Sequence, residues 1–370
     1  DTPVPTSTSP PTHTPTPTST KTPTPVPSPT ATLPPIRVSQ YAPNQGSSLE
    51  ELVVLRGEEF DPTAKVSGGV GEITAFWDID ADGVPESEEI DPAPFELAPG
   101  EYHNAYVEFT DEQQTVRKEL PRIVKVGEPD YPDWEYGVGA LFNSYWGYYS
   151  DFGEVEKALQ IMEDLGIDVL RIDFPWSIIE EMGDDNFSWR EYDSLVNLIV
   201  GEYGFDIMPV IGYSPPWASN TPSDPKPWEC PPENTDQFMD FANTIASRYA
   251  DDIVAWQIWN EPNVSKYFRG TDVSLYTEIL KKAYSGIKYA DPSDIVVTAG
   301  LSNDAGADYP QWVFIDPSLF LQGIYDNGGK GYFDAVARHP YVEPTSWGLG
   351  YLQNEIARLQ TVMLRNDDSE

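Results

Sequence analysis

The sequence is poor in cysteine and in basic residues, and it lacks any long apolar run. Cys230 is the only cysteine, which excludes an internal disulfide and a cysteine-rich zinc site. The 22 basic residues against 61 acidic ones give a net charge of −39, which repels nucleic acid phosphates and anionic membrane surfaces. The acidic charge therefore predicts that nucleic acid is not a partner. No run of roughly 18 apolar residues is present, so we expect no membrane span.

Aromatic residues are abundant, with 11 Trp and 21 Tyr. A neutral polymer is not repelled by an acidic surface, and flat aromatic faces stack against sugar rings. These residues therefore favour a polysaccharide or oligosaccharide as partner. The alternative, in which the same side chains fill a hydrophobic core, stays open for each of them.

Composition divides the chain into three parts. Residues 1–35 contain 12 Pro and 12 Thr and almost no large apolar side chains, which is typical of a disordered linker. Such a stalk indicates a secreted or cell-surface protein. We expect a small β-sandwich in residues 36–127 and an α/β domain in residues 128–370.

Short alternating runs separated by Gly, Pro and Asp predict that residues 36–127 form an antiparallel sandwich. The predicted strands are 51–55, 73–77, 102–109 and 120–126. The segment from Phe76 to Gly83, taken with 99–102 and 107–111, resembles the PKD-like branch of immunoglobulin-like domains. That resemblance implies an accessory or spacer role.

One loop of this region matches the calcium-binding pattern D-x-D-x-D-G-x5-E. Its carboxylates are Asp78, Asp80, Asp82 and Glu89, with Gly83 at the turn. Proline residues after the loop exclude the second helix of an EF-hand. Structural Ca²⁺ is one prediction, and an exposed acidic turn without metal is the other.

Strand-like and helix-like segments alternate from about residue 136, which is typical of βα units on a parallel sheet. We predict six strands, at residues 137–142, 167–174, 205–211, 253–260, 295–299 and 333–338. Apolar residues at helical spacing predict helices around 155–165, 238–249, 275–287 and 352–363. This pattern predicts about six of the eight units of a (β/α)8 TIM barrel. A doubly wound sheet is the alternative, but no glycine-rich phosphate turn follows any strand.

Three polar motifs follow the predicted strands: Arg171 in Leu170-Arg-Ile-Asp173, then Asn260-Glu261-Pro-Asn263, then His339-Pro-Tyr341. With them the domain resembles the clan A glycoside hydrolases, nearest to families 39 and 5. The resemblance implies that Glu261 is the acid/base and that Asn260 binds the sugar 2-hydroxyl. It also implies that Arg171 orients the nucleophile and that His339 and Tyr341 contact the substrate.

Glycoside hydrolysis needs one protonated carboxyl group and one ionised carboxylate, about 5–5.5 Å apart in retaining enzymes. Glu261 fits the first task. The resemblance places the nucleophile on strand seven, after a helix that here runs from Leu349 to about Arg365, and the sequence ends at Glu370. We therefore expect a truncated chain that lacks its nucleophile and is inactive by itself.

The sequence thus predicts a retaining β-glycosidase for plant or microbial β-glycans such as xylan, glucan or mannan, without a catalytic cofactor. The alternative is a carbohydrate-binding or surface-display protein with a degenerate barrel. Asn263-Val-Ser265 fits the N-glycosylation pattern, but a glycan so close to Glu261 would block the cleft, which favours a bacterial source. Aromatic residues predicted to line the cleft are Tyr145, Trp146, Trp176, Trp217 and Trp347.

Overall fold

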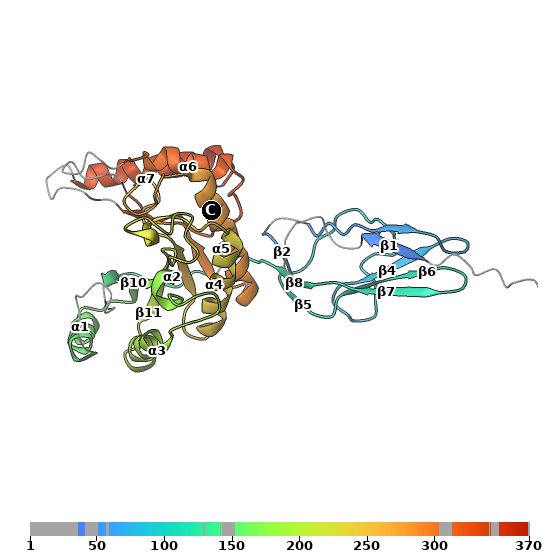
Figure 1. Ribbon diagram of the computed structural model, residues 1–370, viewed down its shortest axis with the longest axis horizontal. Coiled ribbons are helices and arrows are strands. Elements are labelled where there is room, and N and C mark those ends of the chain that lie inside the picture. The colour runs from blue at the N-terminus through green and yellow to red at the C-terminus, as the bar shows by residue number, and fades with distance from the viewer. Residues whose placement is uncertain are drawn as a thin grey trace, which may run out of the picture.

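The computed structural model describes residues 36–40, 51–56, 59–128, 130–140, 142, 152–302, 313–339, 341 and 348–368. A β-sandwich and an α/β module follow one another along the chain (Figure 1). The predicted Thr/Pro linker lies outside the described residues.

The described part of the sandwich contains eight short strands in three small sheets. One pairs β1 (Arg37–Gln40) with β3 (Lys65–Ser67), the second orders β4 (Thr74–Asp78), β6 (Tyr106–Thr110) and β7 (Thr115–Glu119), and the third orders β2 (Glu51–Val54), β8 (Arg122–Lys125) and β5 (Gly100–Tyr102). Side chains on β4 and β6 alternate between core and solvent, so that Trp77, Val107 and Phe109 are fully buried. This alternation is the pattern that predicted the sandwich.

Two features of the sandwich differ from the sequence prediction. The sandwich is not wholly antiparallel, because β2 runs parallel to β8, with Leu52 opposite Ile123. These strands are far apart in sequence, and short-range alternation carries no information on their pairing. The run predicted as one strand over 102–109 is two strands, separated at Asn104, whose φ of 61° breaks the extended backbone.

The α/β module is organised around a parallel sheet of five strands, ordered β9, β10, β11, β12, β13. Their bounds are β9 (Gly137–Ala140), β10 (Val169–Pro175), β11 (Asp206–Gly212), β12 (Ala255–Ile258) and β13 (Ile295–Val297). β14 (Leu301–Ser302) pairs in parallel with β15 (Arg338–His339), and a bridge from Val297 to Ala335 joins this pair to the sheet. The topology fits a partial barrel with its sixth strand around residues 335–339.

Helices follow the strands and cover the outside of the sheet (Figure 1). They are α1 (Phe152–Asp164), α2 (Trp176–Ile179), α3 (Arg190–Val196), the π-helix η2 (Asn197–Glu202), the 3-10 helix η3 (Pro227–Glu229), α4 (Thr235–Arg248), α5 (Val273–Ala290), α6 (Pro317–Asp326) and α7 (Gly348–Arg365). The apolar spacing predicted α1, α4, α5 and α7. Asn234 and Asp272 cap α4 and α5 by accepting hydrogen bonds from backbone N–H groups of the first turn.

The core of the module has an inner and an outer layer. Ala255, Ile295 and Val297 fill the inside of the sheet, with Met208 and Ala335 packed against them. The outer layer, between sheet and helices, holds most of the large aromatic side chains. The core alternative therefore holds for several of the abundant aromatics, since the indoles of Trp77, Trp176, Trp256 and Trp259 are fully buried.

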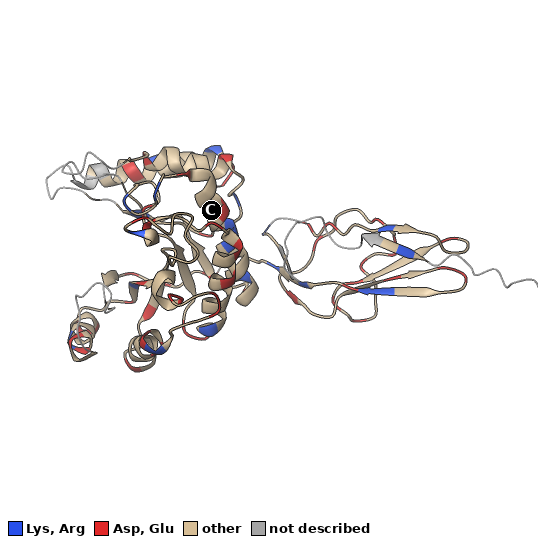
Figure 2. Ribbon diagram, in the orientation of Figure 1, with Lys and Arg blue, Asp and Glu red and all other residues tan. Residues whose placement is uncertain are grey.

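Acidic side chains are spread over the helices and loops of both modules, with fewer basic ones among them (Figure 2). Of the helices that the structure describes, none joins the length and the apolar character needed to cross a bilayer.

Candidate active site

The turn after β12 has an unusual backbone. Trp259 and Glu261 both lie in the left-handed region, with φ of 70° and 46°, which side-chain-bearing residues rarely adopt. The turn is held because the Trp259 backbone N–H donates to Ile211 O and its indole N–H donates to Tyr267 O, both at 2.8 Å. Backbone strain of this kind persists only where the surrounding structure over-determines it, and it is common at active sites.

Asn263 also holds the turn after β12 in place, through hydrogen bonds of its side chain. Its side chain is fully buried, and its amide nitrogen donates to Ser302 O and Ile315 O, each at 2.8 Å. Its amide oxygen accepts from Ser302 N at 3.1 Å. One asparagine thus ties the turn of Glu261 to the segments on either side of the undescribed residues 303–312.

Glu261 is 5 % exposed and makes two side-chain hydrogen bonds through one oxygen. Oε1 lies 2.7 Å from His339 Nδ1 and accepts from the Tyr341 hydroxyl at 3.1 Å. Among the described residues, Oε2 has no hydrogen-bond partner. The carboxyl group is therefore fixed in orientation by one oxygen while the other remains available to a ligand.

His339 reaches Glu261 because residue 300 is a glycine. A Cβ atom on Gly300 would lie 2.1 Å from His339 Nε2, far inside the contact distance of real atoms. Gly300 also bridges to Asn260, the neighbour of Glu261. The imidazole thus packs on the bare backbone between the end of β13 and the Asn-Glu turn.

Arg171, on β10, lies in a polar network beside this group. Its Nε donates to Gln257 Oε1 at 2.6 Å and its Nη2 donates to Asn260 Oδ1 at 3.0 Å. Gln257 is buried inside β12 and donates onward to Thr298 O at 3.2 Å. Gln257 therefore fixes the guanidinium, and the bond to Arg171 leaves the Asn260 amide NH₂ free to donate.

Two tyrosines near Glu261 keep their protons. Burial raises the pKa of Tyr341 to about 12, and the nearby Glu261 carboxylate adds to the effect. Burial also raises the pKa of Tyr213 well above its usual value, with Asp173 contributing next. Tyr341 thus remains a hydrogen-bond donor to Glu261 across the neutral and moderately alkaline range.

The structure therefore brings together five of the predicted site residues, namely Arg171, Asn260, Glu261, His339 and Tyr341. Gln257 was not among the predicted site residues, and Asn263 was predicted only as part of the Asn-Glu motif, without a role of its own. A signal for Gln257 was present, since it is a polar residue in the middle of an apolar strand.

The prediction that Trp176 lines the cleft is wrong. Its indole is fully buried, packs against Phe238 and Phe241, and donates to the buried Glu180. Trp217 is half-buried, lies edge-on to Trp176 and donates to Glu180 O at 2.7 Å. Trp146, together with Tyr145 and Trp347, lies outside the described residues.

The acidic loop of the sandwich gathers a different set of carboxylates from the one predicted. Asp78, Asp80 and Glu86 bring one oxygen each within 4.8 Å of one another. Asp82 instead accepts from Val84 N, and Trp77 donates its indole N–H to the backbone oxygen of Glu89. Glu86, which the predicted pattern did not include, therefore joins Asp78 and Asp80 in the carboxylate cluster of the described residues that could hold a metal ion, and calcium binding stays a prediction.

No protein-family model matches the sequence. Solved structures that are similar include a family 39 glycoside hydrolase from Bacteroides cellulosilyticus, at 19 % identity and a TM-score of 0.43 over 80 % of this chain and 57 % of that one. A family 39 β-xylosidase from Caulobacter crescentus matches at 17 % identity and a TM-score of 0.45, over 64 % and 52 %. A xylanase from Cellvibrio japonicus matches at 16 % identity and 0.43, over 62 % and 67 %. The chain thus spans little more than half the length of the two family 39 structures.

Proposed function

We propose that this protein is a glycoside hydrolase that cleaves O-glycosidic bonds in β-glycans, with Glu261 as acid/base. The observation that carries the proposal is the geometry of its carboxyl group. Glu261 follows a buried parallel strand, Oε1 is fixed by His339 and Tyr341, and Oε2 has no partner among the described residues. The carboxyl ends of barrel strands are where such enzymes carry their catalytic groups.

The chemistry follows from this arrangement. Oε2 delivers a proton to the glycosidic oxygen as the bond breaks, and positive charge develops on the anomeric carbon. His339 and Tyr341 keep the carboxyl group in one orientation, so little motion is needed to reach the leaving oxygen. In the second half of a retaining reaction, Glu261 takes a proton from the attacking water.

Asn260 and Arg171 are suited to the supporting roles. Asn260 Oδ1 accepts a hydrogen bond from Arg171, so the NH₂ group of Asn260 can donate to a sugar hydroxyl. Within the described residues, Arg171 Nη1 makes no hydrogen bond, so it is available to orient an ionised carboxylate.

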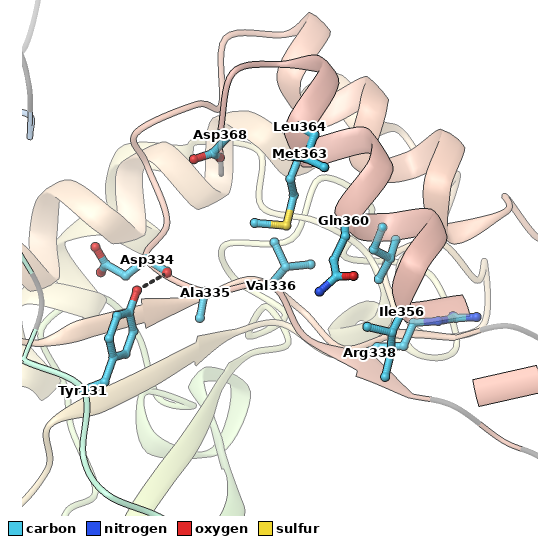
Figure 3. Close-up of a pocket in the computed structure, with 11 residues that line it drawn as sticks. Tyr131, Asp334, Ala335, Val336, Arg338, Ile356, Gln360, Met363, Leu364 and Asp368 are labelled. Atoms are coloured by element: carbon cyan, nitrogen blue, oxygen red, sulfur yellow. Dashed lines mark hydrogen bonds between the residues drawn. The ribbon is translucent and has the colours of Figure 1, made fainter. Parts of the chain in front are cut away.

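The nucleophilic carboxylate belongs, on this proposal, to a strand that pairs with the open edge of β15. No described strand pairs with that edge. A groove of about 660 Å³ runs between residues 334–338 and α7, lined by Ala335, Val336, Leu359 and Met363 (Figure 3). A parallel strand placed there would end beside Glu261, because β15 ends at His339.

The proposal is tested with aryl β-glycosides and with xylan, glucan and mannan. We expect no turnover by residues 1–370 alone, and turnover by a longer protein in which a further strand, with a carboxylate at its carboxyl end, pairs with β15. In the active protein, Glu261→Ala should lose roughly 10²- to 10⁴-fold in rate, the range of general acid catalysis. Azide, which fits the space left by the side chain, should restore turnover and yield a β-glycosyl azide.

Glu181→Gln is the matched control, because Glu181 is an exposed carboxylate away from these contacts. It should keep full activity. Turnover by residues 1–370 alone would refute the assignment of the nucleophile. Full activity of Glu261→Ala would refute the acid/base role, and tight glycan binding without turnover by the longer protein would favour the carbohydrate-binding alternative.

A further inference from the structure

The sandwich shares a hydrophobic core with the barrel module. Leu55, which follows β2, and Val126, which follows β8, are 5 % and 1 % exposed and belong to the same apolar cluster as the barrel residues. The Val126 N–H donates to Val54 O at 3.0 Å, so both sandwich segments enter the contact together. Flexibly tethered domains do not normally merge their cores in this way.

Asp334 connects four parts of the molecule at this contact. Its carboxylate is fully buried and lies 3.0 Å from Lys288 Nζ on α5 and 3.4 Å from Arg56 Nη2 of the sandwich. It also accepts from Val296 N on β13 at 2.8 Å. The Tyr131 hydroxyl, from the segment joining the modules, donates to the Asp334 backbone oxygen at 2.6 Å (Figure 3).

A cation–π pair, which does not involve Asp334, also joins the sandwich to the barrel module. The guanidinium of Arg122 on β8 lies 4.0 Å from the ring centre of Tyr289, near the end of α5. Glu101 of the sandwich holds the guanidinium from the sandwich side at 2.5 Å. A cation held over an aromatic ring in this way contributes most when it is shielded from water, and the Arg122 side chain is only 21 % exposed.

All these contacts lie at the amino-terminal end of the barrel strands. Asp334 precedes β15, and Lys288 and Tyr289 lie in the last turn of α5, whereas Glu261 and His339 lie at carboxyl ends of strands. The sandwich lies to one side of the module, next to α5 (Figure 1). The contacts between the described residues of the sandwich and the barrel therefore lie at the end opposite to Glu261.

We propose that the sandwich is held rigidly against the barrel through Arg56 and Arg122, so that Glu261 lies at the end of the barrel that faces away from the sandwich. The sequence indicated a spacer; the contacts indicate a rigid one with a set direction. Any group to which the sandwich side of the protein is attached then lies behind the barrel, and a polymeric substrate approaches the opposite end. The rigid placement of the sandwich does not depend on the chemistry of Glu261, whereas the direction from which a polymer approaches rests on the proposed function.

The test is the distribution of distances between spin labels on the two modules, measured by double electron–electron resonance. Labels go on Glu96→Cys, an exposed sandwich position, and Asp251→Cys, an exposed barrel position. The native Cys230 is fully buried and should not react. We expect one narrow distribution in the full chain, and at least a twofold wider one after Arg56→Met and Arg122→Met are combined.

Substitution on the sandwich side leaves Asp334 paired with Lys288, so the barrel should still fold. Arg117→Met is the control, because Arg117 pairs with Glu108 and Glu119 within the sandwich, and it should leave the distribution narrow. Proteolysis within residues 127–136 should be roughly 10-fold faster in the double variant than in the control. A wide distribution in the parent chain overturns the proposal, and so does a double variant as narrow and as resistant as the parent.

Discussion

The imidazole of His339 lies directly over the Cα atom of Gly300, with no room for a methyl group between them. Replacing Gly300 by alanine should therefore displace His339 and break its hydrogen bond to Glu261. The cost of overpacking is about 1–3 kcal/mol in the free energy of unfolding. The chain has only 3 His residues, so the His339 ring signals can be followed by NMR.

We expect Glu261→Gln to shift the His339 ring signals in the parent chain but to leave them unchanged in a Gly300→Ala background. Gly139→Ala is the matched control, because a Cβ atom there meets nothing within 4 Å. An equal shift in both backgrounds would show that His339 keeps its contact in spite of the methyl group.

Asp294 should give the protein a pH-dependent stability. Burial raises the pKa of this carboxyl to about 7 from its usual 3.8, against the lowering effect of the Trp256 indole N–H that donates to it. The folded state therefore keeps the proton up to about pH 7, while the unfolded chain loses it near pH 4. This group's contribution to stability is greatest below pH 4 and falls as the pH rises to 7.

Asp294→Asn keeps an acceptor for the indole without the charge. Relative to the parent, its free energy of unfolding should be similar at pH 4 and higher by about 2–4 kcal/mol at pH 8. Urea denaturation at both pH values measures the difference. Asp251→Asn, at an exposed position, should show no such trend. Parallel stability curves for parent and Asp294→Asn would contradict the buried, protonated state.

We expect the acidic loop to bind calcium through Glu86 and not through Glu89. Weak extracellular sites have dissociation constants of about 10⁻⁴–10⁻³ M, so 10 mM Ca²⁺ would add about 1.4–2.7 kcal/mol to the stability of the sandwich. We expect Glu86→Gln to abolish the rise in melting temperature and Glu89→Gln to preserve it. No rise in the parent protein removes the calcium prediction altogether.

Local patterns predicted the parts of this protein that local physics decides. Apolar spacing located α1, α4, α5 and α7, and the apolar run before Asn260 placed Glu261 at a strand end. The helical segment Arg190–Glu202 was missed because it continues as a π-helix, whose extra residue per turn displaces the apolar face. The short α6 was also missed, although its buried residues Phe320, Leu321 and Ile324 lie at helical spacing.

Long-range relationships could not be predicted in the same way. The burial of Trp176 depends on Phe238 and Phe241, which lie more than sixty positions away, and the fixed orientation of Arg171 depends on Gln257. In the acidic loop the spacing of carboxylates matched a calcium-binding pattern, but the structure groups Glu86 with Asp78 and Asp80, with Ala81 at φ of 58° in the turn between them. A motif fixes the order of residues along the chain and leaves their final geometry to the backbone.

The left-handed backbone of Glu261 lowers the stability of the fold, whereas the proposed reaction needs the carboxyl group at this position. A glycine or an asparagine adopts φ near 46° with less strain than a glutamate, so either substitution should relax the turn. Selection for heat resistance alone should therefore favour substitutions that remove the carboxyl group, so a more heat-stable variant of this protein is expected to carry an inert residue at position 261.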